Sequence, residues 1–145
     1  MSNTDRSVGQ TRDTGFQVGV RRTLSIPPAD AWKLLTSREG ARLWLGEIPE
    51  AELAQDLGYR LEDGTSGSVT VFEPGSHLRL TWQRPGWARP SIIQLRVLPS
   101  GERTTVAFHQ EHLPGPAERE ERRAFYTGVL DQLRRITGGQ DSSDK

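Results

Sequence analysis

The stretch Ser25-Ile-Pro-Pro-Ala-Asp-Ala-Trp-Lys-Leu-Leu-Thr-Ser-Arg-Glu-Gly-Ala-Arg-Leu-Trp-Leu-Gly46 decides the fold, because a strand gives way in it to two short helices. The strand pattern ends at Pro27-Pro28, since proline lacks the N–H that a strand needs and has the backbone angle of a first helical turn. We expect one helix over residues 29–35. Ser37 is expected to cap a second helix, because its hydroxyl can accept from the free N–H groups of the first turn. The apolar face of this helix pair consists of Trp32, Leu35, Leu43 and Trp44.

On both sides of this stretch, apolar residues alternate with polar ones, as they do in half-buried strands. The strand before the helices has one face made of Phe16, Val18, Val20, Leu24 and Ile26, which Arg22 interrupts. Five strands follow the helices, separated by turn sequences such as Pro74-Gly75. Their inward residues are expected to be Leu61, Val69, Val71, Leu80, Trp82, Ile93, Leu95, Val106 and Phe108. Short turns between alternating strands predict an antiparallel meander.

The last predicted element is a helix over residues 117–137. Glutamates in its first turns and arginines in its last turn suit the helix dipole, and Gly138 ends it. We expect one buried stripe, made of Phe125, Val129, Leu133 and Ile136. Gly128 lies close to this stripe, although glycine costs about 1 kcal/mol inside a helix relative to alanine. We interpret it either as a point of close approach to the sheet, an indole or a ligand, or as a merely tolerated glycine.

Three motifs carry a family resemblance: the stretch 25–46, "EPGSHLRLTWQRPGW" at residues 73–87, and "TTVAFHQEHLPG" at residues 104–115 before the last helix. Their order and spacing resemble the activator of heat-shock-protein-90 ATPase homologue family, within the START/polyketide cyclase (SRPBCC) superfamily, over residues 16–137. Tyr126 is a departure, because it stands where the family usually has a tryptophan.

The resemblance and the strand pattern together predict an α+β helix-grip (START-like) fold. In it a curved antiparallel sheet wraps around a long C-terminal helix, in the order β-α-α-β5-α. We expect one domain at residues 16–137, preceded by a disordered leader at 1–15 and followed by a disordered tail at 138–145, because both ends are polar and aperiodic.

Composition excludes several classes of function. Nineteen basic and nineteen acidic side chains cancel, so no overall field attracts nucleic acid or an anionic membrane. There is no cysteine, and therefore no disulfide, thiolate metal site or cysteine nucleophile. No apolar run has the length of a signal peptide or a membrane span. We expect a soluble, cytoplasmic protein.

The sequence contains no nucleophile elbow, P-loop or dinucleotide-binding motif. His77 lies beside a turn, and His109 and His112 have opposite parity if their strand continues, so we predict no metal site. Arg22 faces inward by parity. We consider either an ion pair with Glu73 or a position at an open end of the sheet, where the guanidinium would lie in water. We assign no catalytic residue and no cofactor.

Binding of a small hydrophobic molecule is the function that we predict. Helix-grip folds commonly enclose a cavity, and the resemblance therefore implies one between the sheet and the C-terminal helix. Its lining is expected to be Trp32, Trp44, Val71, Leu80, Trp82, Leu95, Phe108, Gln110, Phe125, Tyr126 and Val129.

Two alternatives stay open. A cofactor-free cyclase, hydrolase or isomerase would be favoured by an inward acid beside a histidine. A chaperone- or partner-binding module would be favoured by a packed interior and a large exposed apolar patch.

Overall fold

The computed structural model describes residues 10–11 and 15–138. Most of the predicted leader and all of the predicted tail except Gly138 lie outside the described residues. The elements are β1 (Gln10–Thr11), β2 (Gly15–Leu24), α1 (Pro28–Thr36), α2 (Arg38–Trp44), β3 (Gly58–Arg60), β4 (Ser66–Glu73), β5 (His77–Trp82), β6 (Ser91–Ser100), β7 (Arg103–Leu113) and α3 (Pro116–Ile136).

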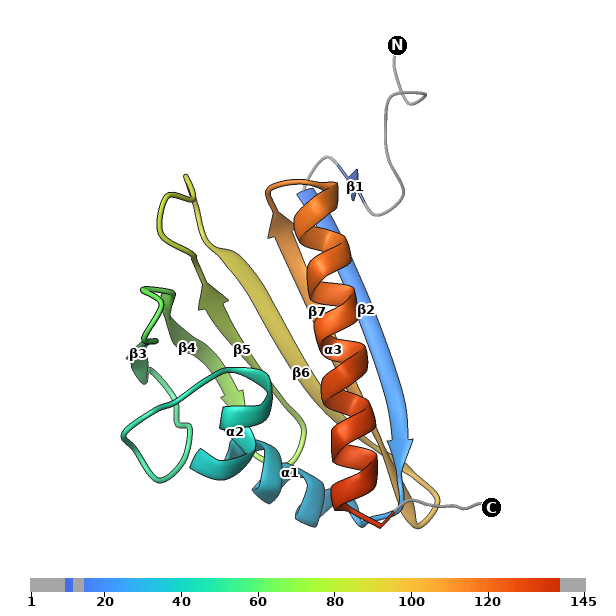
Figure 1. The fold of residues 1–145 in the computed structure, drawn as a ribbon. Coiled ribbons are helices and arrows are strands. Elements are labelled where there is room, and N and C mark those ends of the chain that lie inside the picture. The colour runs from blue at the N-terminus through green and yellow to red at the C-terminus, as the bar shows by residue number, and fades with distance from the viewer. Residues whose placement is uncertain (1–9, 12–14, 139–145) are drawn as a thin grey trace.

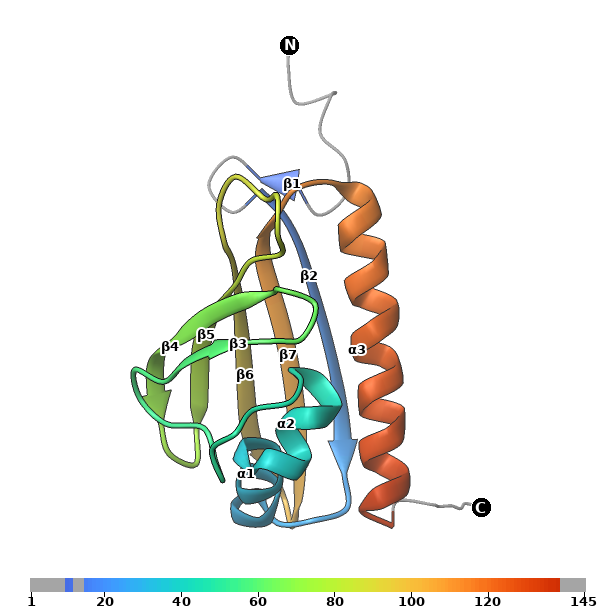
Figure 2. The same cartoon turned by 60° about the vertical axis from the view of Figure 1, so that its left-hand side comes forward.

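The strands form one antiparallel sheet in the order β1-β2-β7-β6-β5-β4-β3. All three helices lie over the same face of this sheet, with α3 along β2 and β7 and the pair α1–α2 at one end (Figures 1 and 2). The predicted helix-grip fold and its five strands after the helix pair are confirmed. The short strand β1 has no sequence signal, because its two residues are polar and lie in an aperiodic segment.

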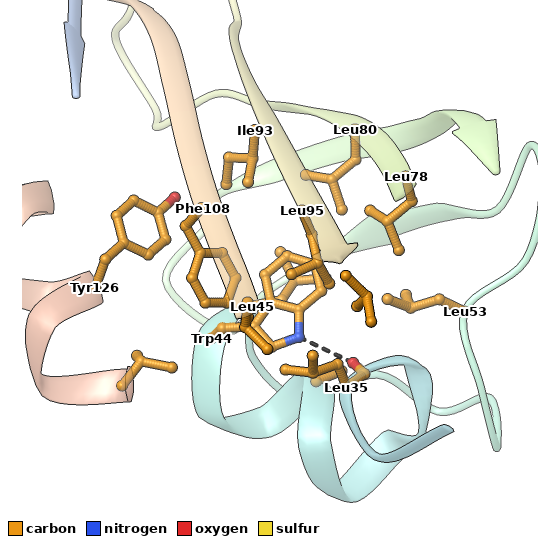
Figure 3. Close-up of a cluster of buried hydrophobic side chains, with 14 of the residues drawn as sticks. Leu35, Trp44, Leu45, Leu53, Leu78, Leu80, Ile93, Leu95, Phe108 and Tyr126 are labelled. Carbon is orange, nitrogen blue, oxygen red and sulfur yellow. Dashed lines mark hydrogen bonds between the residues drawn. The ribbon is translucent and has the colours of Figure 1, made fainter. Parts of the chain in front are cut away.

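The helix pair forms as its sequence predicts. Pro28 begins α1, and the Ser37 hydroxyl accepts a hydrogen bond from the Gly40 N–H at 3.1 Å, which caps α2. Gly40 allows the two helices to meet closely, because a Cβ at this position would lie 1.7 Å from the Leu34 carbonyl oxygen. The Trp44 indole N–H donates to the Leu35 carbonyl at 2.9 Å, so the buried tryptophan has its polar atom satisfied (Figure 3).

The buried stripe of α3 differs in phase from the prediction. Its buried residues are Arg119, Arg122, Tyr126, Val129, Leu130 and Leu133. Phe125 is 37% exposed and Ile136 is 55% exposed, so both were wrongly placed in the stripe. The Tyr126 side chain faces the core, in the place expected for Phe125. Val129 and Leu133 are buried as predicted, but the stripe continues from Val129 to Tyr126, three residues earlier, and not to Phe125, four residues earlier. Because the helix turns by 100° at each residue, the two neighbouring aromatics lie on different faces.

Gly128 is not a point of close approach. A Cβ at this position would have no heavy atom within 4 Å beyond its own helical neighbours, and the residue is exposed. It is a tolerated glycine on the outer face of α3.

A β-bulge in β4 corrects the predicted orientation of Val71. Val69 lies opposite Leu80 and Val71 opposite Arg79, so Thr70 is an extra residue in the ladder. After the bulge, Val71 shares a face with the exposed Arg79. Phe72 takes the inward position instead, where its ring lies 5.5 Å from that of Trp32.

Arg22 faces α3, as its parity predicts, and its guanidinium pairs with Asp131 rather than with Glu73. The Arg22 side chain is partly exposed, and it lies beside the second half of α3, where Asp131 is. The Arg22 hydrogen bond holds the pKa of the Asp131 carboxyl below its usual range. The pair ties β2 to α3.

None of the described helices combines the length and the apolar character needed to cross a membrane.

Candidate ligand-binding site

The residues predicted to line a cavity fill the space between α3 and the sheet themselves. The Tyr126 ring stacks on Phe108 with centroids 4.9 Å apart, and Phe108 also contacts Trp44 at 5.6 Å (Figure 3). Apart from Val71 and Phe125, the whole predicted set is buried: Trp32, Trp44, Leu80, Trp82, Leu95, Phe108, Gln110, Tyr126 and Val129. The structure thus brings nine of the predicted residues into one core, with aromatic rings in the position of the expected cavity.

A chain of hydrogen bonds crosses this core near the first half of α3. Arg122 Nε and the Tyr126 hydroxyl both donate to the Gln110 carbonyl oxygen, at 2.9 and 2.7 Å. Gln110 Nε2 donates to the Ser91 hydroxyl at 2.8 Å, which in turn donates to the Trp82 backbone carbonyl at 2.6 Å. Burial raises the pKa of the Tyr126 phenol, so it is a neutral donor at physiological pH.

Arg122 is a buried cation whose hydrogen-bond acceptors are both neutral. It is 4% exposed, and it donates to Gln110 and, at 3.2 Å, to the Tyr126 hydroxyl. None of the ion pairs among the described residues involves it. Its guanidinium lies 4.1 Å from the centre of the Trp82 ring and 4.4 Å from that of Phe125. These cation–π contacts offset part of the free-energy cost of burying the charge.

Several polar atoms around this core have no hydrogen-bond partner among the described residues. They are Trp82 Nε1, Arg119 Nε, His112 Nδ1 and Thr65 Oγ1, and all four are buried. Native structures pair most buried polar atoms, so each exception calls for an explanation, such as a bound group. Arg119 lies one turn before Arg122 on the same face of α3 and is 9% exposed.

His112 is placed by a second β-bulge, at the end of β7. Phe16 lies opposite Leu113 and Val18 opposite Gln110, so β7 has one residue more than β2 in this interval. His112 has a φ of 65°, in the left-handed region that is uncommon for a residue other than glycine. Strained residues of this kind cluster at functional sites. The bulge turns His112 toward a pocket.

That pocket has a volume of about 410 Å³ and lies where the end of β7, the start of β2 and the loop after β5 meet. Its walls consist of Gly15, Phe16, Gly86, Trp87, Ala88, Arg89, His112, Leu113 and Pro114. The volume falls in the range of small-molecule sites, and apolar walls with a few polar groups are typical of them. Trp87 also contacts Trp82 edge to face at 5.6 Å, so the indoles of Trp87 and Trp82 separate the pocket from the buried Arg122.

The other two histidines lie apart from this pocket. His109 Nε2 is 2.9 Å from the Gln17 side-chain oxygen, and burial lowers the pKa of the imidazole. His77 is hydrogen-bonded to its neighbour Ser76 at 2.9 Å. Within the described residues, no group of three or more His, Cys, Asp or Glu side chains is placed to hold a metal ion.

Sequence reasoning found Gln110, Tyr126 and Trp82 but missed Arg119, Arg122, Trp87 and His112 as a group. A signal for the two arginines exists in α3. Residues 119, 122, 126, 129 and 133 have the alternating three- and four-residue spacing of a buried helix face, and the arginines occupy its first two positions. Because arginine side chains usually lie in water, this spacing was not interpreted as a buried face.

The comparisons with known proteins agree with this architecture. A family model described as "Activator of Hsp90 ATPase homolog 1-like protein" matches residues 25–138. No curated protein sequence matches the chain.

Solved structures of the same fold include DynU16 from the dynemicin biosynthetic locus, with a TM-score of 0.71 and 18% identity. CalU16 from Micromonospora echinospora has a TM-score of 0.70 and 21% identity, and the Aha1 dimer from Colwellia psychrerythraea has 0.68 and 15%. The similar regions cover 82%, 83% and 83% of this chain, and 46%, 73% and 95% of those proteins in the same order. This chain thus spans less than half the length of DynU16, and the likeness to all three concerns the fold.

Proposed function

The chain belongs to the family of proteins like the activator of Hsp90 ATPase homologue 1, and from this premise we propose that it binds a small, largely apolar molecule. The proposed site is the pocket at the start of α3, not the space between α3 and the middle of the sheet. One observation carries the proposal. A pocket of about 410 Å³ with apolar walls contains a strained histidine whose Nδ1 is buried and unpaired among the described residues.

The large apolar side chains of the pocket and His112 have different roles in the proposed binding. Phe16, Trp87 and Leu113 offer apolar surface to the ligand body, because burying such surface is the main favourable term in association. The His112 imidazole offers a polar contact, as donor or acceptor according to its tautomer.

Binding is favoured over the two alternatives by specific observations. The large exposed apolar side chains of the described residues are Phe125 and Ile136, which lie three turns apart on α3 and form no continuous patch for a protein partner. The ion-pair partner of His112 is its neighbour Glu111, and His112 Nε2 lies 3.9 Å from Glu111 Oε2, longer than a hydrogen bond. We therefore assign His112 to ligand recognition.

The experiment is a thermal-shift titration with neutral probes, 2-naphthamide and decanol, read together with tryptophan emission. We expect the melting temperature to rise with probe concentration by mass action, and the emission to change because Trp87 forms a wall. Ala88→Trp should abolish the shift, since Ala88 is an exposed residue of the pocket wall and a larger side chain there fills the pocket.

The matched control is Ala124→Trp, which adds the same side chain on the exposed face of α3. It should bind both probes like the unmodified protein. Equal shifts in the two variants would place binding elsewhere, and no shift with either probe in the unmodified protein would overturn the proposal.

A further inference from the structure

Resting on the binding function proposed above, we infer that the ligand carries a carboxylate, which Arg119, Arg122 and the Trp82 indole N–H receive. The apolar body of the ligand occupies the pocket beside Trp87, and its acid group extends toward the inner face of α3.

The charge of the interior is the first argument. Arg119 and Arg122 are 9% and 4% exposed and lie on the same inward face of α3. Moving a guanidinium out of water is costly unless an anion compensates it. The ion-pair partner of Arg119 is the solvent-exposed carboxylate of Glu120 at 3.4 Å, and Arg122 has only neutral acceptors. Glu121 is paired with Arg84 and acts on Arg122 only from a distance, so a ligand anion would supply the direct contact that Arg122 lacks.

The count of hydrogen-bond donors is the second argument. Arg119 Nε and Trp82 Nε1 are buried, both can only donate, and neither has an acceptor within the described part of the chain. Two donors without acceptors indicate that the absent group accepts hydrogen bonds. A carboxylate offers two oxygens with about four acceptor positions, and it matches the fork of a guanidinium. A neutral amide offers only one oxygen and adds donors of its own.

The position of the cluster is the third argument. The Arg122 guanidinium lies over the Trp82 ring, and Trp82 contacts Trp87, which forms a wall of the pocket. Trp87 is half-buried in the loop after β5, and the inferred binding requires its indole to move aside so that the acid group reaches Trp82 and the arginines. Gln110 and Tyr126 hold Arg122 in place, so the cation is oriented before the ligand arrives.

The test compares 2-naphthoate with 2-naphthamide, which have nearly the same shape but differ in charge. Both are titrated calorimetrically at pH 7.5 and low salt, where the acid is ionised. We expect the acid to bind at least about tenfold more tightly than the amide, as a charge-assisted pair at a buried site implies. This comparison needs no variant and therefore does not depend on how a mutation affects folding.

Variants then assign the preference to residues. Arg122→Gln and Arg119→Gln should each reduce the preference for the acid to less than about threefold while the amide still binds. Arg134→Gln removes the same charge from the exposed last turn of α3 and should leave the preference unchanged. The fold of each variant is verified by circular dichroism before titration.

The outcomes separate the two proposals. Equal binding of acid and amide overturns the carboxylate but leaves the binding function standing. A preference that survives both arginine variants also overturns the assignment. Failure of both probes to bind the unmodified protein overturns the binding function, and the inference about the acid with it.

Discussion

Arg84 and Glu121 form a two-pronged ion pair that joins the loop after β5 to the first half of α3. Arg84 Nη1 donates to Glu121 Oε1 at 2.9 Å and Nη2 to Oε2 at 2.5 Å. The Arg84 guanidinium also lies 4.8 Å from the centre of the Trp82 ring, on which Arg122 packs as well. The pair therefore fastens the loop that carries Trp87 against the helix that carries the buried arginines.

Replacing Glu121 should lower stability in a way that depends on pH. The Arg84 hydrogen bonds hold the pKa of the Glu121 carboxyl below its usual range. Because the folded-state pKa lies below the unfolded one, the stabilisation is complete above the unfolded value of about 4.3 and is lost as pH falls through the folded value. In urea unfolding at pH 7, Glu121→Gln should cost up to about 1 kcal/mol, as partly exposed pairs do.

At pH 3 the difference between Glu121→Gln and the unmodified protein should be smaller than at pH 7. Glu102→Gln, in the exposed turn after β6, serves as the control and should have no effect at either pH. A cost for Glu121→Gln that is the same at both pH values would show that the ion pair contributes nothing.

The phase of the α3 stripe is tested by two truncations. Leu133 is fully buried, so Leu133→Ala should reduce the free energy of unfolding by about 2–5 kcal/mol. Ile136 lies three residues further along and is mostly exposed, so Ile136→Ala should change it by less than about 0.5 kcal/mol. Similar losses in the two variants would mean that the helix packs in another phase.

Two helical glycines should respond to alanine with opposite signs. Gly128→Ala should stabilise the protein by up to about 1 kcal/mol, because the position is open and alanine is the better helix former. Gly40→Ala should destabilise it strongly, because the new Cβ would collide with the Leu34 carbonyl oxygen. Chemical denaturation of both variants checks the prediction, and a loss of stability in Gly128→Ala would contradict it.

The backbone strain at His112 can be measured separately from its role in binding. Because a left-handed conformation costs roughly 1–2 kcal/mol for a residue with a Cβ, His112→Gly should be more stable than His112→Ala by about 1 kcal/mol. Both variants should bind 2-naphthamide more weakly than the unmodified protein. If glycine gives no advantage over alanine in thermal unfolding, the residue is unstrained and its conformation says nothing about function.

All elements of the fold except β1 could be predicted, because each of them has a local signal. Pro27-Pro28 and Ser37 mark the helix pair by chemistry that acts within one turn, and the alternation of apolar residues marks the strands. The two bulges have no comparable signal. Whether Thr70 or His112 is the extra residue depends on which partner each strand meets, and that pairing is decided between segments distant in the sequence. Val71 and Phe72 consequently exchanged faces.

The candidate site was harder to predict than the core. Gln110 could be placed inward by the period of its strand. Tyr126 was expected there from the family resemblance, because the predicted helical stripe had placed its neighbour Phe125 inward instead. Arg119 and Arg122 are buried, although arginine usually lies in water. Their helical spacing indicates a buried face, but the residue type indicates exposure, and the prediction followed the residue type. Trp87 lies in a loop, where no periodicity indicates the direction of a side chain.

The position of β2 in the sheet has a consequence for how the protein is made. This strand is near the start of the chain, yet it pairs with β7, and the hydrogen-bonded side chains of Gln17 and His109 are 92 residues apart in sequence. During synthesis β2 leaves the ribosome long before its partner exists, whereas β3 to β6 can pair with neighbours as they emerge. A nascent chain that stops before Arg103 therefore lacks β7, the strand that connects β2 to the rest of the sheet. The native sheet closes only when residues 103–113, which form β7, have been translated.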